Sequence, residues 1–433
     1  MGRIRKPSPV LPVVVLLLAA TLAVVALLSA ALLPEETLQP TKYLQPATTT
    51  RSKVTVTPHR QILISLGQEP STVFISWKGN RGGPAYLRYA DEQKDLPQAK
   101  IIKADKKHIL GSKYYRYSVK VENTGRCFYE IGDGVAFDRP RFIEKRNSGN
   151  KTRFLFFGDV QLEGEVPYWE QMIKEACPED CDFAMFGGDM VNVPTDLSQW
   201  ERFLNNCGVF DSLPVMTAAG NHEGVHSNVT YRKIFASPGN GPKGLKEEFY
   251  FFDYGSCRVL VLDSSFFTDA RKGKLGEARW NSQRKSINRW LTKTLNESPK
   301  LWNIAVIHHP PYGMHSDKEV SEDLRKWWVP LLEKYRVDLV LSGHQHLYMR
   351  TRPINGIVYL MGNSGVRSSR FYDGRNKPFY VDCVYAEGAG YQMIEVDLRG
   401  LKISACNKKG RIVDEALIKK SSFLHILKFL GGN

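Results

Sequence analysis

The chain has 433 residues, enough for two domains with a substantial core, and its 42% hydrophobic and 24% charged residues exclude a largely disordered protein. A formal net charge of +15 at pH 7 favours anionic partners such as phosphorylated substrates, acidic glycans or membrane surfaces, or reflects a solubilising excess of surface Lys and Arg. Because no compact Lys/Arg run is interleaved with aromatic residues, we expect no nucleic-acid partner.

The first 33 residues predict entry into the secretory pathway. Residues 1–9 form a basic segment, and residues 10–33 carry no charge. About 20 apolar residues span a bilayer as a helix, whereas signal-peptide cores are about 7–15 residues long, so the length favours an uncleaved signal anchor. Residues 1–9 would then stay cytosolic and the rest of the chain would be lumenal or extracellular, in a single-pass membrane protein. Small residues at positions 29–31 also permit a cleaved signal peptide and a secreted protein.

Two further features agree with this compartment. Three triplets match the N-glycosylation acceptor pattern, although such triplets are common by chance; they begin at Asn150, Asn228 and Asn296. The seven cysteines allow up to three disulfides with one thiol left over. Cys177 and Cys181 lie on either side of a Pro-Glu-Asp turn and are candidates for a structural pair.

The next two segments predict a linker and a β-domain. Residues 34–57 are rich in Thr and Pro and predict a linker. Residues 58–147 contain short alternating segments about ten residues apart, a pattern typical of a β-sandwich. Trp77 is its expected core aromatic residue. This region carries no cluster of His, Asp or Cys, so we assign it no chemistry.

From residue 150 to about 420 the pattern changes to apolar runs that end in polar residues, with helical patterns between several of them. Near-continuous apolar strands that alternate with helices predict an α/β domain whose sheet is covered on both faces. In such sheets the ligand lies outside the carboxyl ends of the strands. Residues 421–433 have apolar residues at helical spacing and are interpreted as an amphipathic tail that docks on the protein body or lies on a membrane.

Five of the predicted strands end in residues that can bind a metal. These ends are Gly158-Asp159, Gly188-Asp189, Gly220-Asn221-His222-Glu223, His308-His309 and Gly343-His344-Gln345-His346. Each alone is weak evidence, because a Gly-Asp pair usually makes a turn and a lone His is usually a core residue. Together they predict a site, and carboxylate, amide and imidazole without thiolate suit iron, zinc or manganese. His344 and His346, two residues apart, can serve two metals.

This order resembles the calcineurin-like metallophosphoesterases, whose pattern is GD…GD…GNH(D/E)…H…GHxH, and within them the purple acid phosphatases. The resemblance covers about residues 58–420, including a closing strand pair at 401–420. It implies an α/β protein in which a fibronectin type III-like β-sandwich precedes a four-layer α/β/β/α catalytic domain. It also implies an acid phosphatase-type hydrolase that cleaves phosphate monoesters of small molecules or proteins by in-line attack of a metal-bound hydroxide.

Two other functions remain open. A phosphodiesterase or nucleotide pyrophosphatase would share the metal site and differ in the loops around it. A catalytically impaired binding ectodomain, in which the metal core serves as a scaffold, is the alternative from a different class of protein.

The resemblance further implies two metal ions per chain. The ligands carried over by position are Asp159 and His346 for one metal, Asn221, His308 and His344 for the other, and Asp189 as the bridge. His308 is preferred to its neighbour because it directly follows an apolar strand and precedes His309-Pro310, as in the family. His222 and, more loosely, His315 would contact the substrate phosphate as catalytic residues. A protonated histidine in this role predicts an acid-side pH optimum.

One family ligand is missing. The purple enzymes have a tyrosinate in the motif GDxxY, and Asn192 stands at that position here. The wider superfamily instead supplies a histidine two residues after the first aspartate, where this chain has Gln161. Gln161, Asn192 or a water would have to fill the position. Losing an anionic ligand favours divalent iron, zinc or manganese and predicts a colourless protein, whereas the alternative is partial loss of the metal site.

Overall fold

The structure, a computed structural model, describes residues 60–79, 82–122, 125–144, 151–162, 167–176, 178–205, 212–224, 229–271, 273, 276–314, 318–367, 372 and 375–420. They belong to one unit that spans Thr55–Asn433. The predicted basic segment, membrane or signal segment, linker and C-terminal tail lie outside the described residues. Within the described ranges, no helix is long and apolar enough to span a membrane.

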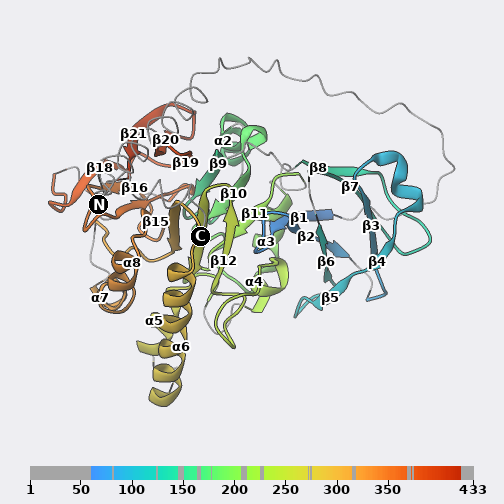
Figure 1. The fold of residues 1–433 in the computed structure, drawn as a ribbon, viewed down its shortest axis with the longest axis horizontal. Helices are drawn as coiled ribbons and strands as arrows, with labels where there is room; N and C mark the ends of the chain where they lie inside the picture. The colour runs from blue at the N-terminus through green and yellow to red at the C-terminus, as the bar shows by residue number, and fades with distance from the viewer. Residues whose placement is uncertain are drawn as a thin grey trace, which may run out of the picture. The chain divides into compact units, whose positions relative to one another are not determined.

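Residues 60–144 form two four-stranded antiparallel sheets, in the orders β1-β2-β6-β5 and β4-β3-β7-β8 (Figure 1). The strands are β1 Arg60–Leu66, β2 Thr72–Gly79, β3 Tyr86–Ala90, β4 Ile101–Lys103, β5 Asp105–His108, β6 Tyr115–Glu122, β7 Arg126–Gly132 and β8 Arg141–Glu144, and a 3-10 helix, η1, spans Gln93–Gln98. Residues of both sheets share one buried cluster that contains Trp77, as predicted, with its ring 5.8 Å from that of Tyr117. The edge strands β4 and β5 were not predicted, because their mostly exposed residues give no alternating pattern.

The rest of the chain builds two larger sheets. The six-stranded sheet has the order β11-β10-β9-β19-β20-β21, and the seven-stranded sheet has the order β12-β13-β14-β15-β17-β16-β18. Their strands are β9 Thr152–Phe157, β10 Phe183–Phe186, β11 Val215–Thr217, β12 Tyr250–Tyr254, β13 Cys257–Leu262, β14 Trp302–Ile307, β15 Leu339–Ser342, β16 Tyr348–Thr351, β17 Val358–Met361, β18 Val381–Tyr385, β19 Gly390–Val396, β20 Leu401–Asn407 and β21 Ile412–Ile418. The six apolar runs that end in polar residues became β9, β10, β11, β13, β14 and β15, and the predicted closing pair became β20 and β21.

Alternate side chains of each strand point to opposite faces of its sheet, and the two sheets and their helices therefore form four layers. In β9, Phe154 and Phe156 belong to the core between the two large sheets, whereas Leu155 and Phe157 face the helices. The residue pattern predicted a sheet with helices on both faces. In the structure each sheet has helices on one face and the other sheet on its second face, because a strand buried by a sheet is as apolar as one buried by a helix. The result is the α/β/β/α order that the resemblance implies.

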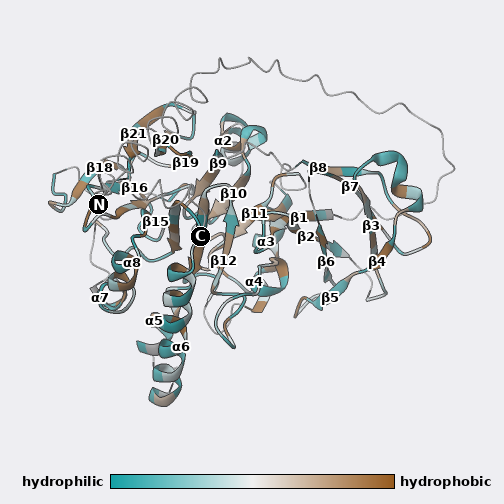
Figure 2. Ribbon diagram, viewed as in Figure 1, coloured by the Kyte–Doolittle hydropathy of each residue, from teal (hydrophilic) through white to brown (hydrophobic). Residues whose placement is uncertain are grey.

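The helices cover the two outer faces. The helices are α2 Pro167–Glu175, α3 Leu197–Asn205, α4 Val229–Ile234, α5 Ser265–Arg271, α6 Glu277–Asn296, α7 Lys318–Trp327 and α8 Val329–Lys334, with a 3-10 turn, η2, at Pro178–Asp180. α2, α3 and α4 pack on the six-stranded sheet, and α5 to α8 on the seven-stranded sheet. In α6, buried Ile287, Leu291 and Leu295 recur every four residues, while most of the helix is hydrophilic (Figure 2).

The cysteine and glycosylation predictions are only partly within the described residues. Asn296 is exposed at the end of α6, and Asn150 and Asn228 lie outside the described ranges. Cys177 also lies outside them, so its pairing with Cys181 stays a prediction. Cysteines with free thiols in the described part of the chain include Cys127, Cys257, Cys383 and Cys406.

Candidate metal centre

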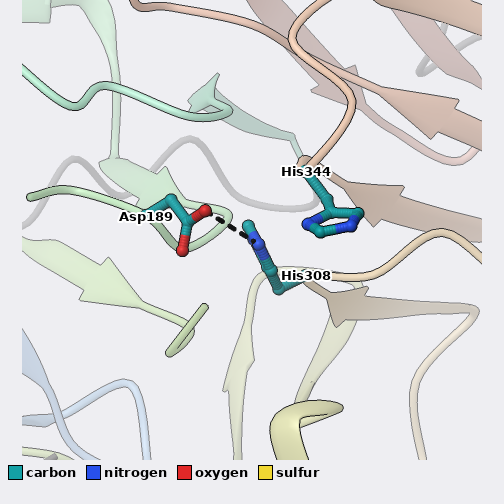
Figure 3. A group of neighbouring side chains, drawn as sticks. All are labelled: Asp189, His308 and His344. Atoms are coloured by element: carbon teal, nitrogen blue, oxygen red, sulfur yellow. Dashed lines mark ion pairs between the residues drawn. The ribbon is translucent and has the colours of Figure 1, made fainter. Parts of the chain in front are cut away.

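The predicted strand ends come together at one edge of the two large sheets. β9 is followed by Asp159, β10 by Asp189, β11 by the segment 221–223, β14 by His308 and β15 by the segment 344–346. Three side chains form the centre of this cluster: the ligand atoms of Asp189, His308 and His344 all lie within 4.8 Å of one another (Figure 3). His308 Nε2 is 3.2 Å from Asp189 Oδ2, and both side chains are buried.

Asn221 and His222 complete one side of the cluster. Asn221 Oδ1 lies 3.1 Å from His308 Nε2, and the backbone N–H of His222 donates to Asp189 Oδ1 at 2.9 Å. His308 Nδ1–H donates to Gly187 O at 2.9 Å, which fixes its tautomer and turns Nε2 toward the shared space. The structure therefore brings four of the predicted residues, Asn221, His308, His344 and Asp189, into one group.

Asp159 and His346 form the other side. His346 Nε2 is 3.5 Å from Asp159 Oδ1, and the backbone N–H of His344 donates to Asp159 Oδ2 at 2.5 Å. Asp159 is 1% exposed, yet its Oδ1 has no hydrogen-bond partner among the described residues. Burying such an oxygen without a partner is costly unless a cation or a proton donor meets it.

The two candidates for the missing ligand are placed differently. Gln161 is 2% exposed, its Nε2 is 3.5 Å from Asp189 Oδ2, and its Oε1 is a second buried oxygen without a hydrogen-bond partner in the described structure. Asn192 contacts the site through its backbone: its carbonyl accepts from His222 Nδ1–H at 2.7 Å. Of the two contacts, only that of Gln161 with Asp189 is made by the side-chain amide, whose Oε1 is free of hydrogen bonds in the described structure.

Several backbone conformations at the cluster are strained. Four non-glycine residues have positive φ values: Gln161 (36°), Asp189 (52°), His344 (78°) and His346 (54°). Each such conformation costs roughly 1–3 kcal/mol and persists only where the surroundings enforce it. Gly188 also has a positive φ, 102°, and a Cβ there would lie 2.6 Å from His308 Nδ1. The predicted turn glycine at this strand end is thus required by a close approach.

Glu223 holds two of these strand ends together, a role that was not predicted. Its buried carboxylate accepts backbone N–H groups of Asp189 (2.8 Å), Gly220 (2.7 Å) and Met190 (2.9 Å). Burial and the nearby Asp189 carboxylate raise the pKa of Glu223 to about 8. The available signal was its place in the intact GNHE motif, directly after Asn221-His222.

The ring of His309 contacts the rings of His308 and His344. Its Nδ1 is 2.9 Å from Ser264 Oγ, and burial, then the neighbouring histidines His344 and His308, hold its pKa well below the usual value. A buried neutral imidazole bonded to a serine supports the choice of His308 over His309 as the ligand. His315 lies outside the described residues.

Opposite charges within the cluster oppose the effects of burial on its pKa values. Burial alone would raise the pKa of Asp189, but His308 opposes burial and holds that pKa well below its usual range. Burial alone would lower the pKa of His308, but the Asp189 carboxylate raises it to about 10. A proton on His308 thus balances the buried carboxylate. The donor set, with two buried oxygens that take no hydrogen bond among the described residues, on Asp159 and Gln161, fits divalent metal ions.

Comparison with known proteins agrees with this geometry. The family model of calcineurin-like phosphoesterase matches residues 152–348. An uncharacterized protein of Mycobacterium tuberculosis H37Rv is 30% identical over 242 residues, which cover 53% of this chain and 44% of that protein. Probable inactive purple acid phosphatase 24 of Arabidopsis thaliana is 28% identical over 244 residues, covering 47% of this chain and 37% of that protein. The match therefore spans less than half the length of either relative.

A solved structure shares the fold over most of the chain. Purple acid phosphatase PPD1 from yellow lupin (Lupinus luteus) seeds has a TM-score of 0.67 and 16% sequence identity, and the match covers 86% of this chain and 76% of that chain.

Proposed function

Because the chain belongs to the purple acid phosphatase-like metallophosphoesterases, with its calcineurin-like phosphoesterase domain at residues 152–348, we propose that it hydrolyses phosphate monoesters at a centre of two divalent metal ions. The observation that carries this proposal is the convergence of Asp189, His308 and His344 beside the buried Oδ1 of Asp159, which takes no hydrogen bond among the described residues and lies 3.5 Å from His346 Nε2. The substrate would be a phosphorylated small molecule or protein.

Each ion would have its own group of ligands on either side of Asp189. Asp159, His346 and Gln161 would hold the first ion, and Asn221, His308 and His344 the second. Asp189 lies 3.5 Å from Gln161 Nε2 and 3.2 Å from His308 Nε2, which supports its role as the bridge. When bound, the ions would supply the charge that polarises the phosphate and acidifies a water for in-line attack. Iron(II), zinc and manganese all suit this mostly oxygen and nitrogen donor set.

His222 would act on the substrate. Asn192 O accepts its Nδ1–H, which fixes the ring, and its side chain is 31% exposed, so Nε2 can reach a ligand from solvent. Once Nε2 is also protonated, it can donate to a phosphate oxygen or to the departing alkoxide. This role requires the imidazolium and therefore favours an acidic pH optimum.

The test is phosphate release by the full chain from a monoester and a diester, at several pH values between 5 and 9, with iron(II), manganese or zinc supplied. Asp189→Ala should lose both activity and most of the bound metal, while Asp105→Ala, at an exposed position of β5, should retain both. Preference for the diester would select the phosphodiesterase alternative. Absence of both metal and turnover would select the binding ectodomain, which the word "inactive" in a relative's name keeps open.

We also propose that the N-terminal β-domain is fibronectin type III-like. One of its sheets has the order β1-β2-β6-β5, and the other has the order β4-β3-β7-β8. This order corresponds to the A-B-E-D and C-F-G sheets of immunoglobulin-like sandwiches, with one added edge strand. The N-terminal segment at 10–33 stays the predicted anchor or signal peptide, with the catalytic domain outside the cytosol.

A further inference from the structure

A cavity of about 290 Å³ lies at the carboxyl end of β13. Four charged side chains line it: Arg232 from α4, Glu248 from the segment before β12, Asp263 directly after β13, and Arg279 from the first turn of α6. We call this cavity the charged pocket. None of the four is a proposed metal ligand, so the pocket is a site of its own.

Two of the four charges already neutralise each other. Arg232 Nη1–H donates to Glu248 Oε1 at 3.0 Å, and the side chain of Glu248 is 8% exposed. This ion pair leaves the pocket with one further carboxyl group and one further guanidinium. The chemistry of a ligand is therefore set by Asp263 and Arg279.

Asp263 is a buried acid that lacks a cation. It is 2% exposed, and its Oδ1 accepts the backbone N–H of Ser265 at 2.9 Å. Among the described residues, its Oδ2 accepts no hydrogen bond and neither oxygen forms an ion pair. Burial, and then the nearby Glu248 carboxylate, raise the pKa of Asp263 to about 7. A buried carboxylate without a cation is costly, so this end of the pocket suits a ligand with an ammonium group.

Arg279 gives the pocket a basic side that faces solvent. Its side chain is exposed, and it forms no ion pair or hydrogen bond with a residue that the structure describes. The pocket thus offers a buried carboxyl group and an exposed guanidinium. A ligand that satisfies both carries an ammonium group and a carboxylate.

Further walls of the pocket are apolar. They include Leu245, Phe249 and Phe266, and the ring of Phe266 stacks on that of Trp280 with the centroids 4.7 Å apart. Pockets for small molecules usually measure about 300–1,000 Å³, so this one is near the lower limit. Its size suits one small molecule with an apolar side chain.

We propose that the charged pocket binds an α-amino acid with an apolar side chain, whose ammonium group meets Asp263 and whose carboxylate meets Arg279. Both contacts would be charge-assisted hydrogen bonds, which are stronger than those between neutral groups. The proposed hydrolytic function is not needed for this inference.

The experiment is isothermal titration calorimetry of the full chain with L-leucine and with two molecules that each carry half of its charges. 3-Methylbutylamine lacks the carboxylate, and 4-methylpentanoate lacks the ammonium group. Because each charged contact is lost with its group, we expect leucine to bind more tightly than either half by at least about tenfold.

Two variants assign each charge of the ligand to its partner. Asp263→Asn keeps the size of the side chain and an acceptor for Ser265 N–H, and it should weaken binding of leucine and of the amine. Arg279→Ala changes an exposed residue, and it should weaken binding of leucine but not of the amine. Arg289→Ala, also exposed on α6 but outside the pocket, is the matched control and should change neither. Thermal unfolding of each variant confirms that it is folded.

The inference is overturned if leucine, glycine and phenylalanine all fail to bind, or if leucine binds equally well to both pocket variants. Tight binding of 4-methylpentanoate that depends on Arg279 alone would also overturn it, because the site would then be one for anions. Phosphate release from the same preparations keeps the two proposals separate. Leucine binding without turnover would count against the hydrolytic function alone, and turnover without amino-acid binding against the charged pocket alone.

Discussion

At the scale of single residues, the proposed first metal site depends on Gln161 to fill the position of the missing ligand. Its Oε1 is buried without a hydrogen-bond partner in the described structure, and its Nε2 lies 3.5 Å from Asp189 Oδ2. Gln161→Ala removes this neutral oxygen, so we expect the metal content after dialysis to fall from near two ions per chain toward one. Elemental analysis of the dialysed protein measures it.

Asn192→Ala is the matched control for that change. Its contact with His222 is made by the backbone carbonyl, which alanine retains, so the metal content should not change. Loss of metal in Asn192→Ala together with normal content in Gln161→Ala would reverse the assignment. Gln161→His should bind more tightly than wild type, because an imidazole is the stronger ligand.

The raised pKa of His308 predicts how the affinity for metal depends on pH. Burial lowers its pKa, but the Asp189 carboxylate raises it to about 10, so His308 is protonated in the metal-free protein at neutral pH. A metal ion must displace that proton from Nε2, and affinity should therefore rise by about tenfold per pH unit as pH increases from 6 to 8. Titration in chelator-buffered metal at three pH values measures this slope. A slope near zero would mean that another group receives the ion.

At the scale of elements, Glu223 connects the ends of β10 and β11. Its carboxylate accepts from the backbone N–H groups of Asp189, Gly220 and Met190, and Asp189 is held at a φ of 52°. Glu223→Gln keeps the size of the side chain but places an NH₂ group against some of these donors. We expect the free energy of unfolding to fall by about 3 kcal/mol, with lower kcat and less change in KM. Urea unfolding and steady-state kinetics measure both effects.

Glu223→Asp tests the reach of this side chain. The shorter acid keeps the carboxyl group but cannot reach the N–H groups of Asp189, Gly220 and Met190 together, so it should lie between wild type and Glu223→Gln in stability. If both variants are as stable as wild type, the strand ends after β10 and β11 do not depend on the Glu223 side chain for their stability.

The strands that are buried along most of their length were predictable from the sequence. Runs such as that of β14 are apolar enough to be recognised alone, and the polar residue that follows each run is where the chain leaves the core. The edge strand β5, of sequence Asp-Lys-Lys-His, was not predictable, because it is fixed by its pairing with β6 and not by burial. For the same reason, nothing local indicated that two sheets face each other.

The site was predictable in its residue types and less so in its geometry. The Asp, Asn and His residues at five strand ends indicated metal ligands together, although each strand end alone is more often a turn or a core residue. The choice between Gln161 and Asn192 needed coordinates, since it depends on which side chain points at Asp189. The contacts of Glu223 also needed coordinates, because its hydrogen-bond donors are backbone N–H groups, which every sequence supplies.

At the scale of the whole molecule, the β-sandwich and the two large sheets share one buried cluster. It runs from Trp77 in β2 to residues such as Met216 in β11, whose sulfur accepts the backbone N–H of Leu66 at 3.2 Å. A continuous core predicts one cooperative unfolding transition, since neither part keeps its buried surface without the other.

Trp77→Ala tests this coupling from the β-sandwich side. The residue is fully buried and far along the chain from every proposed metal ligand, and its loss should reduce the free energy of unfolding by about 3–5 kcal/mol. If the two parts unfold together, calorimetry will show a single transition at lower temperature, and the proposed phosphatase activity will be lost on heating at that same temperature. Independent parts would instead show a second transition, in which activity is lost at the wild-type temperature after the sandwich has melted. Phe142→Ala, at an exposed position of β8 outside the shared cluster, is the control. It should change neither the transition temperature nor the temperature at which activity is lost.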